Sequence, residues 1–367
     1  MRITFLLPGL SRVPVGGYKI VYEYGNRLAA RGHAVTIVHP YAPGLMRTAS
    51  DAPSHWPERF KQRLWPLLRR PRSGRRNARL VPWFAVRPGV RLLLAPDLSE
   101  KFMPDADAIF STAWQTARPV HALSAAKGEK YYFIQHYETA EGAPDEARVR
   151  ATWTLPLHKV VSAQWLLQIA ASLGEEKRTT YIPYGVDFSH FKMTTPLDER
   201  APRVGMLYHR DMWKGSAEAI AALATARLQV PYLQAVAFGT PQHPPDFPAW
   251  LEYVQTPSPH ELNALYNGCS IFLQASWSEG WGLTASEAMA CGCALLTTDN
   301  GGSREYAVHE KTALVAPIQN EDALATQLLR LLHNDTLRQR LAHAGYGHVR
   351  QFTWQRAVDS LEFLLEK

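Results

Sequence analysis

The sequence predicts an α/β protein with two doubly wound, Rossmann-like parallel sheets joined by a linker. The chain has 367 residues, which is too long for one ordinary domain and suits two. Short apolar runs alternate with amphipathic stretches along it, as strands and covering helices do. Residues 181–187 contain a Pro and a Gly and separate two halves that each show this alternation. We therefore place the linker near that stretch.

The first forty residues predict a βαβ unit. Residues 3–7 are a short apolar run that predicts a strand, and residues 8–17 form a loop rich in Gly and Pro. Residues 18–31 carry apolar side chains four apart, which predicts a helix, and residues 34–38 predict the second strand. A strand, loop, helix and strand in this order imply a parallel sheet covered by helices.

The rest of the chain repeats this pattern. Further strands are expected at residues 108–111, 131–135, 160–162, 203–207, 232–238, 271–273 and 294–298. Helices are expected at residues 217–227, 322–332, 337–344 and 354–365, and residues 286–290 begin another.

Composition and apolar runs indicate where in the cell the protein is located. Three cysteines, Cys269, Cys291 and Cys293, lie late in the chain without a paired metal-ligand spacing, which fits a reducing compartment. The apolar run at the N-terminus is about five residues long and suits a strand better than a signal peptide. No apolar stretch reaches the ~20 residues of a membrane helix. We expect a cytoplasmic protein, with a peripheral position at the inner face of the membrane left open.

The net charge of +7 comes from one segment of the chain. Residues 56–79 hold nine Lys or Arg against one acid, a net +8, so the remainder sums to about −1. Aromatic residues lie among these cations, which suits an anionic membrane surface. A solvated loop explains the same segment equally well. Nucleic acid has no supporting fold signal, and we expect none as a partner.

The most informative motif spans residues 278–292, between a predicted strand and a helix. Gly280 and Gly282 let the backbone approach a ligand, and unpaired N–H groups of a first helical turn favour a diphosphate. Glu287, one turn inside, could accept hydrogen bonds from vicinal ribose hydroxyls, and Glu279 from a sugar hydroxyl. Spacing alone leaves ligand binding and a structural Gly-rich turn equally open.

The spacing of Glu279 and Glu287 resembles the E-x7-E motif of retaining GT-B glycosyltransferases, family 4 in particular. In that family the first Glu contacts the donor sugar and the second binds the ribose. The loop amides bind the diphosphate, a role that falls here to Gly282, Leu283 and Thr284. The resemblance is strong over residues 183–316, moderate over 1–40 and 130–162, and absent over 41–94.

A second motif, residues 209–215, follows the strand predicted at 203–207. The family usually carries an Arg and then a Lys here, which bind the diphosphate. The resemblance assigns these roles to Lys214 and Arg210. The usual Arg position holds Met206, which is a departure that leaves Arg210 as the nearest substitute. Fixed cations suit a metal-free enzyme, since a diphosphate leaving group carries two to three negative charges. A solvated basic turn is the structural alternative.

Two loops of the first half carry further candidates. Gly16 and Gly17 put N–H groups at a helix start, and the family's equivalent pair lies near the diphosphate and the acceptor. His136 follows a predicted strand, where α/β sites form, and the family has a His near the reacting sugar. Glu138 is a weaker neighbour. Structural roles are the alternative for all four.

A D-x-D string at Asp105 and Asp107 resembles a metal motif of another glycosyltransferase fold. It precedes a predicted strand and is interpreted as a turn, so no metal site is expected.

The resemblance implies a GT-B fold, with two domains facing across a cleft and a C-terminal helix that crosses back. The expected bounds are 1–182 with a basic insert at about 41–94, 183–350, and 351–367. The expected activity is retaining, metal-independent transfer of a hexosyl-type sugar from a nucleotide-diphosphate sugar, without a cofactor. The acceptor would be a glycan or a lipid-linked glycan, as in surface polysaccharide synthesis. An epimerase and a non-catalytic nucleotide-sugar-binding homologue remain as alternatives.

Overall fold

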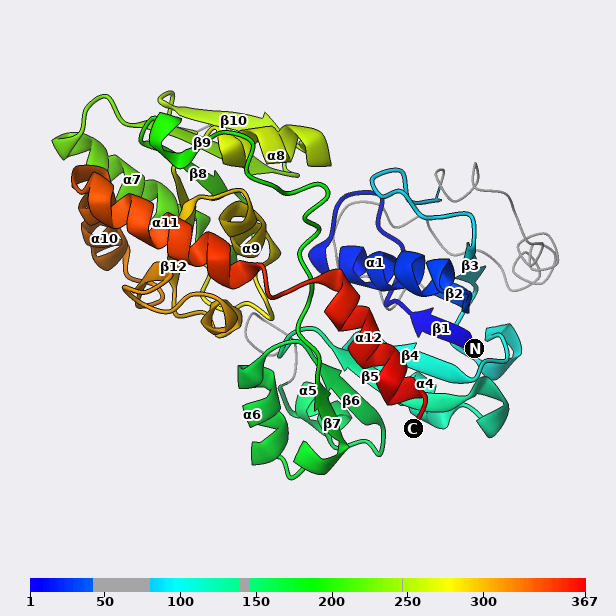
Figure 1. Ribbon diagram of the computed structural model, residues 1–367. Coiled ribbons are helices and arrows are strands. Elements are labelled where there is room, and N and C mark those ends of the chain that lie inside the picture. The colour runs from blue at the N-terminus through cyan, green and yellow to red at the C-terminus, as the bar shows by residue number, and fades with distance from the viewer. Residues whose placement is uncertain (42–79, 139–145, 246) are drawn as a thin grey trace. The chain divides into compact units, whose positions relative to one another are not determined.

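The computed structural model describes residues 1–41, 80–138, 146–245 and 247–367, and these divide into two compact units (Figure 1). The first unit comprises residues 1–162, 166–182 and 358–367, and the second comprises 163–165 and 183–357. The chain enters the second unit at Pro183, within the stretch expected as a linker. The basic segment at 56–79 lies outside the described residues.

The described part of the first unit forms a seven-stranded parallel sheet in the order β3-β2-β1-β4-β5-β6-β7. The strands are β1 (Arg2–Leu6), β2 (Ala34–Pro40), β3 (Val90–Ala95), β4 (Ala108–Ser111), β5 (Glu129–Ile134), β6 (His158–Val161) and β7 (Thr179–Tyr181). Strand order reverses between β1 and β4, so the loops that follow these two strands meet at one edge.

Besides the C-terminal helix, which both units share, four helices of eight or more residues in the described part of this unit accompany the sheet: α1 (Gly16–Ala30), α4 (Trp114–Ala122), α5 (Glu146–Trp153) and α6 (Gln164–Ser172). Helix α1 buries Ile20, Tyr24 and Leu28, the stripe of residues four apart that predicted it. Phe5 and Phe110, on paired strands, stack with ring centroids 4.9 Å apart. The predicted βαβ unit is therefore confirmed as β1, α1 and β2.

One boundary differs from the expectation. The sequence places a basic insert at about 41–94, but Val90–Ala95 forms β3, the edge strand beside β2. Val90 pairs with Val35, and the Arg91 side chain at the next position is exposed. Because an edge strand mixes buried and solvated positions, this short run carries little periodic signal next to a strongly basic segment.

The second unit contains a six-stranded parallel sheet in the order β10-β9-β8-β11-β12-β13. The strands are β8 (Arg203–Leu207), β9 (Gln234–Gly239), β10 (Leu251–Gln255), β11 (Ile271–Gln274), β12 (Ala294–Thr298) and β13 (Ala313–Ala316). Here the order reverses between β8 and β11, where Val204 pairs with Ile271. This reversal places the loops after β8, β11 and β12 side by side.

The helices of this unit are α7 (Ser216–Gln229), α8 (Pro259–Asn267), α9 (Leu283–Ala290), α10 (Glu321–His333) and α11 (Asp335–Val349). Figure 1 shows α7, α10 and α11 packed together beside the sheet. Buried Leu223 of α7 and Leu328 of α10 share one core with Val204 of β8. No helix among the described residues is long and apolar enough to cross a bilayer.

The last helix, α12 (Trp354–Leu365), begins in the second unit and ends in the first, as expected. Within the first unit, Arg31 Nη2 lies 2.7 Å from Asp359 Oδ1. His33 Nε2 lies 2.9 Å from Glu362 Oε1, and Arg31 pairs with the same carboxylate. The Arg31 ion pairs and the His33 contact bind the C-terminal half of α12 to the end of α1.

Candidate functional site

The candidate site lies at the carboxyl edge of the second sheet, where the strand order reverses. Lys214 ends a short 3₁₀ helix (Met212–Lys214) after β8, and Glu279 lies in the loop after β11. Asn300 follows β12. Ligands of open parallel sheets bind at such a point, because the loops of neighbouring strands diverge there.

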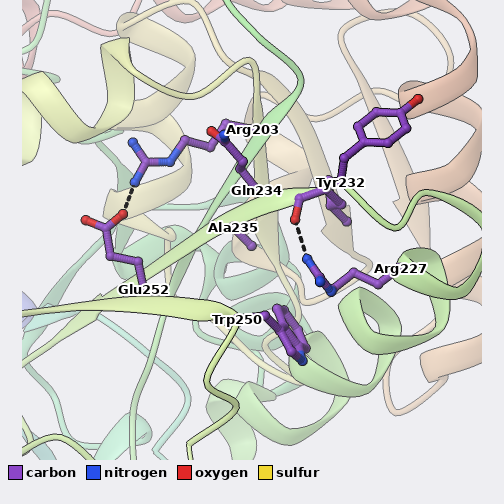
Figure 2. A pocket seen from close by; sticks show the side chains of 8 residues that line it. Arg203, Arg227, Tyr232, Gln234, Ala235, Trp250 and Glu252 are labelled. Carbon is purple, nitrogen blue, oxygen red and sulfur yellow. Dashed lines mark hydrogen bonds and ion pairs between the residues drawn. The ribbon is translucent and has the colours of Figure 1, made fainter.

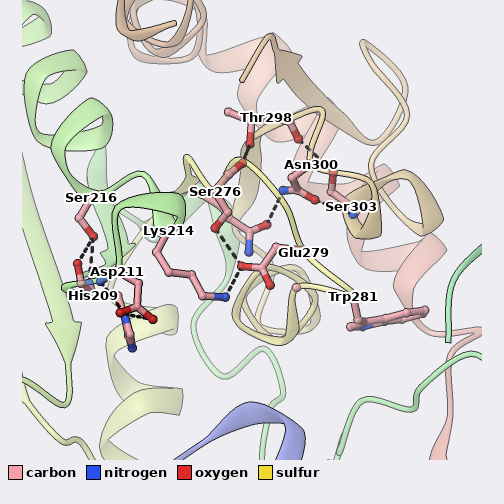
Figure 3. A network of polar contacts seen from close by, with 12 residues as sticks. His209, Asp211, Lys214, Ser216, Ser276, Glu279, Trp281, Thr298, Asn300 and Ser303 are labelled. Carbon is pink, nitrogen blue, oxygen red and sulfur yellow. Dashed lines mark hydrogen bonds and ion pairs between the residues drawn. The ribbon is translucent and has the colours of Figure 1, made fainter. Parts of the chain in front are cut away.

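A charge pair forms the centre of this site (Figure 3). Lys214 Nζ lies 2.7 Å from Glu279 Oε1, and the two side chains are 16% and 11% exposed. Ser276 Oγ donates a hydrogen bond to the same carboxylate oxygen at 2.9 Å. The Lys214 ammonium also lies 3.8 Å from the centre of the Trp213 ring. The structure thus joins two predicted site residues that are far apart in the sequence.

Backbone hydrogen bonds hold the Glu279 loop against the loop after β12. The N–H of Glu279 donates to the Asn300 carbonyl at 2.8 Å, and Gly302 N–H donates to the Glu279 carbonyl at 2.9 Å. The Asn300 side chain accepts from Ser303 N–H at 2.9 Å. Both loops are therefore fixed before any ligand arrives, which favours preorganised binding.

Helix α9 opens beside this pair without a capping side chain. Gly282 has φ +90°, and a Cβ there would lie 2.4 Å from the Tyr306 hydroxyl oxygen. That hydroxyl donates to the Gly282 carbonyl at 2.9 Å. Leu283 and Thr284, in the first turn, are partly exposed, and the helix begins at Leu283 rather than at Ser286. The first-turn N–H groups can therefore bind an anion.

Glu287 lies in the second turn of α9 and is 5% exposed. Its Oε2 accepts a hydrogen bond from the Tyr266 hydroxyl at 3.4 Å. Burial raises the pKa of Tyr266 well above 10, so the phenol keeps its proton and remains a donor. The second glutamate of the motif is thus a buried carboxylate with an identified partner.

The β8 loop approaches β11 closely. Gly215 has φ +65°, and a Cβ there would lie 1.9 Å from the Ala275 carbonyl oxygen, so a side chain has no room. His209 donates its backbone N–H to Ser216 Oγ at 2.9 Å. Burial lowers the pKa of His209; Asp211 opposes this shift and Lys214 adds to it. Arg210 is exposed and has no ion pair or hydrogen bond among the described residues.

The remaining candidates lie in the first unit. Gly16 begins α1, and a Cβ on Gly17 would lie 3.3 Å from the Gln135 side chain. Gln135 and partly exposed His136 follow β5, so the structure brings these predicted residues to one edge of the first sheet.

Glu138, which follows His136, accepts a hydrogen bond from the Trp114 N–H at the start of α4, at 2.8 Å. Burial raises the pKa of Glu138 to about 7, and the Trp114 hydrogen bond opposes that shift. Its carboxyl group therefore changes charge near neutral pH.

The D-x-D string has structural partners. Asp105 pairs with Lys127 at 2.8 Å, and Asp107 pairs with Arg2 at 2.7 Å. Both acids precede β4, at the amino edge of the sheet. The described residues contain no group of three or more His, Cys, Asp or Glu arranged to hold a metal ion.

A pocket of about 490 Å³ lies elsewhere in the second unit (Figure 2). It is lined at the amino ends of β8, β9 and β10, opposite the edge that carries Lys214. Arg203 pairs with Glu252 across it, and the Arg227 guanidinium lies 5.0 Å from the centre of the Trp250 ring. Arg203 and Glu252 neutralise each other, and Arg227 already donates to the Leu233 carbonyl, so we do not place the candidate site there.

Several residues of the site gave no signal in the sequence. Four residues complete the polar network: Ser276, Asn300, Tyr266 and Tyr306. Each is a single polar or aromatic residue beside a strand, loop or helix end, so none belongs to a recognisable motif. The polar run after β12 could have drawn attention to Asn300, since such runs follow strands at ligand edges.

Part of the chain is similar to known glycosyltransferases. Residues 250–348, which include the Glu279 loop and α9, match the family described as Glycosyl transferases group 1. The chain is 30% identical over 107 residues to the uncharacterized glycosyltransferase MJ1178 of Methanocaldococcus jannaschii, covering 29% of this chain and 30% of that protein. It is 27% identical over 279 residues to the O-antigen biosynthesis protein RfbC of Myxococcus xanthus, covering 74% of this chain and 21% of that protein. The matches thus span about a third or less of these relatives.

A solved structure extends the likeness to the whole chain. Alr3699/HepE of Anabaena, in complex with UDP and glucose, aligns with a TM-score of 0.73 at 15% identity. The alignment covers 100% of this chain and 99% of that one. The predicted fold, GT-B with two Rossmann-like parallel-sheet domains, is confirmed.

Proposed function

We propose that this chain is a glycosyltransferase that moves a hexosyl-type sugar from a nucleotide-diphosphate sugar to a glycan or glycolipid acceptor. The observation that carries the proposal is the Lys214–Glu279 pair beside the uncapped start of α9. It lies at the strand-order reversal of the second sheet, and Glu279 lies within the segment that matches Glycosyl transferases group 1.

The donor would bind along this edge. A diphosphate is an anion, so Lys214 and the N–H groups of Leu283 and Thr284 can bind it together. Glu279 would then accept a hydrogen bond from a sugar hydroxyl, and Glu287 from the ribose. The UDP and glucose in the Alr3699/HepE complex support a nucleotide-sugar ligand for this fold.

For the chemistry we propose retention of the anomeric configuration through front-face departure. The bond between the anomeric carbon and the diphosphate oxygen breaks while the acceptor oxygen bonds to the same face of that carbon. The acceptor's proton passes to the departing phosphate oxygen. Lys214 and the start of α9 stabilise the charge that develops there, without a metal ion. We propose that His136 positions the sugar.

The relatives suggest a setting. RfbC of Myxococcus xanthus is named for O-antigen biosynthesis, and O-antigen chain mannosyltransferase B of Escherichia coli is 29% identical over 109 residues. Surface polysaccharide synthesis is therefore the proposed process, with the nucleotide sugar as donor and a lipid-linked glycan as acceptor.

Thermal stabilisation by UDP, GDP, dTDP and their sugars tests the donor site first. A ligand at 100 times its Kd stabilises the folded state by about 2.7 kcal/mol. We expect one nucleotide to stabilise the wild type and Glu321→Ala, an exposed control on α10, but not Glu287→Ala. No shift with any nucleotide would remove the basis of the proposal.

Turnover then separates the enzyme classes. A transferase needs an acceptor for full rate and gives a product whose anomeric proton reports retention by NMR. Conversion of the donor alone would indicate an epimerase, and binding without turnover a non-catalytic homologue. Activity that persists with EDTA would support metal independence, and an inverted product would contradict front-face departure.

A further inference from the structure

We propose that Tyr266 and Arg200 position Glu287 so that the second unit selects ribonucleoside diphosphates over their 2′-deoxy counterparts. The inference rests on the proposed donor role of Glu287. It narrows the donor to nucleotide sugars with an intact ribose, which excludes deoxythymidine diphosphate sugars as preferred substrates.

Tyr266 holds its hydroxyl against Glu287 because its ring is caged. The ring is fully buried near the end of α8. Aromatic rings of Phe191, Phe238 and Phe272 surround it, with centroids 6.0, 5.8 and 5.5 Å from its own. The hydroxyl, fixed in direction by this cage, donates to Glu287 Oε2 at 3.4 Å. This contact limits the rotamers that the Glu287 side chain can adopt.

Arg200 joins the two helices that carry this pair. Its guanidinium is buried, with the residue 7% exposed, and donates to the Cys291 carbonyl at 2.7 Å, at the end of α9. It also donates to Asn267 Oδ1 at 3.0 Å, at the end of α8, and to the Cys269 carbonyl at 3.1 Å. A cation at two helix C-termini is favourable, because the last carbonyls carry partial negative charge.

Arg200 has no carboxylate partner among the described residues, so carbonyl and amide oxygens alone compensate its charge. Burial lowers the pKa of Arg200. A buried guanidinium bound in this way ties the end of α8 to the end of α9 at several points. The separation of Tyr266 and Glu287 therefore depends on Arg200.

The arrangement has a consequence for the ribose. A carboxylate can accept up to about four hydrogen bonds, so Glu287 can hold the Tyr266 hydroxyl and two vicinal hydroxyls together. A ligand without the 2′-hydroxyl leaves a buried carboxylate short of one charged hydrogen bond. That loss weakens binding about tenfold or more. A carboxylate free to turn away would discriminate less.

The test compares UDP, GDP and ADP with their 2′-deoxy counterparts by isothermal titration calorimetry. For the nucleotide that binds, we expect the wild type to prefer the ribose form at least about tenfold. Tyr266→Phe, which keeps the ring in its cage, should reduce this preference about three- to tenfold by weakening ribonucleotide binding, with the deoxynucleotide affinity unchanged. Arg200→Lys keeps the charge but loses the planar guanidinium that bonds several oxygens at once, and it should also reduce the ribose preference. Tyr22→Phe, a buried tyrosine in the first unit, is the matched control.

The outcomes separate this inference from the proposed function. A wild-type ribose preference that Tyr266→Phe and Arg200→Lys both retain would overturn the positioning role. Nucleotide binding without any ribose preference in the wild type would also overturn it, while leaving the diphosphate site intact. If no nucleotide bound the wild type, the proposed function itself would fail.

Discussion

Replacing Lys214 by Met should destabilise the second unit, because the change leaves Glu279 as a largely buried carboxylate without its cation. The two charged atoms lie 2.7 Å apart, and the side chains are 16% and 11% exposed. Methionine is similar in length and can keep the contact with the Trp213 ring. The substitution therefore removes the charge and little of the packing.

The expected cost follows from this burial. Removing one partner of a fully buried pair costs about 3–5 kcal/mol, whereas exposed pairs contribute about 0.2–1 kcal/mol. The remaining exposure, and the Ser276 hydroxyl that still donates to Glu279, reduce the expected cost of Lys214→Met to about 2–3 kcal/mol. Glu279→Gln should cost about 1–2 kcal/mol, since its amide oxygen still accepts hydrogen bonds. The double variant should cost about 1–2 kcal/mol, because neither charge is left unpaired.

Hydrogen exchange in peptides from α9, followed across a urea series without donor, measures these costs. A local probe is required because the chain folds as two units, and a global signal would mix their transitions. The four proteins of the cycle then yield the coupling energy of the pair directly. We expect at least about 1 kcal/mol of coupling.

Additive single and double variants, within about 0.5 kcal/mol, would refute the reasoning. So would a cost of Lys214→Met below about 1 kcal/mol, the value of a solvated surface pair. Either result would mean that water screens the pair and that Lys214 is not held in place before a ligand binds.

Three further predictions concern Gly282, Glu138 and Glu279. Gly282→Ala should destabilise the second unit by more than about 2 kcal/mol and abolish nucleotide binding, because φ is +90° there and the new Cβ meets the buried Tyr306 hydroxyl. Gly347→Ala, in open space on α11, should be neutral or stabilising. Equal unfolding free energies of the second unit in the two variants would contradict this. Burial raises the pKa of Glu138 from 4.5 to about 7, so the stability contributed by its protonated form is full below pH 4.5 and is lost as pH rises through 7. At pH 8 the first unit of Glu138→Gln should therefore be more stable than that of the wild type by about 1–2 kcal/mol, measured by hydrogen exchange in peptides from β5 and α4 across a urea series. A difference that does not vary with pH would count against this. Glu279→Gln should bind a free nucleoside diphosphate at least as tightly as the wild type, because Lys214 is released from its partner. The same variant should bind the nucleotide sugar more weakly. Equal losses of affinity for both ligands in calorimetry would contradict the assignment of Glu279 to the donor sugar.

Much of the fold was predictable because its signals are local. The β1–α1–β2 unit follows from a short apolar strand, a Gly-rich loop and a stripe of residues four apart that includes Ile20, Tyr24 and Leu28. The start of α9 was placed three residues late. Gly282 in the left-handed conformation starts the helix directly, without the polar cap that sequence patterns depend on.

The candidate site was predictable in part. Glu279, Glu287 and Lys214 were singled out from motifs, and the structure places them on one sheet edge of the second unit. Exposed Arg210 lies outside the ion-pair network, and its diphosphate role stays a prediction, as does the role of His136 near the sugar. Neither Tyr266 nor Arg200 belongs to a motif, since each acts through a contact with a distant segment.

The sequence by itself determined the class of fold, the linker and the residue types that a diphosphate site requires, because periodicity, turn residues and helix starts are properties of neighbouring positions. Only the tertiary structure decided which of these residues meet. Parallel strands pair across long connections, so strand order is set by the packing of whole sheets. The reversal between β8 and β11 brings Lys214 to Glu279, and the burial of the Tyr266 ring brings its hydroxyl to Glu287. Those contacts join segments that are distant in the sequence and meet only when the unit packs, so no pattern of neighbouring residues predicts them.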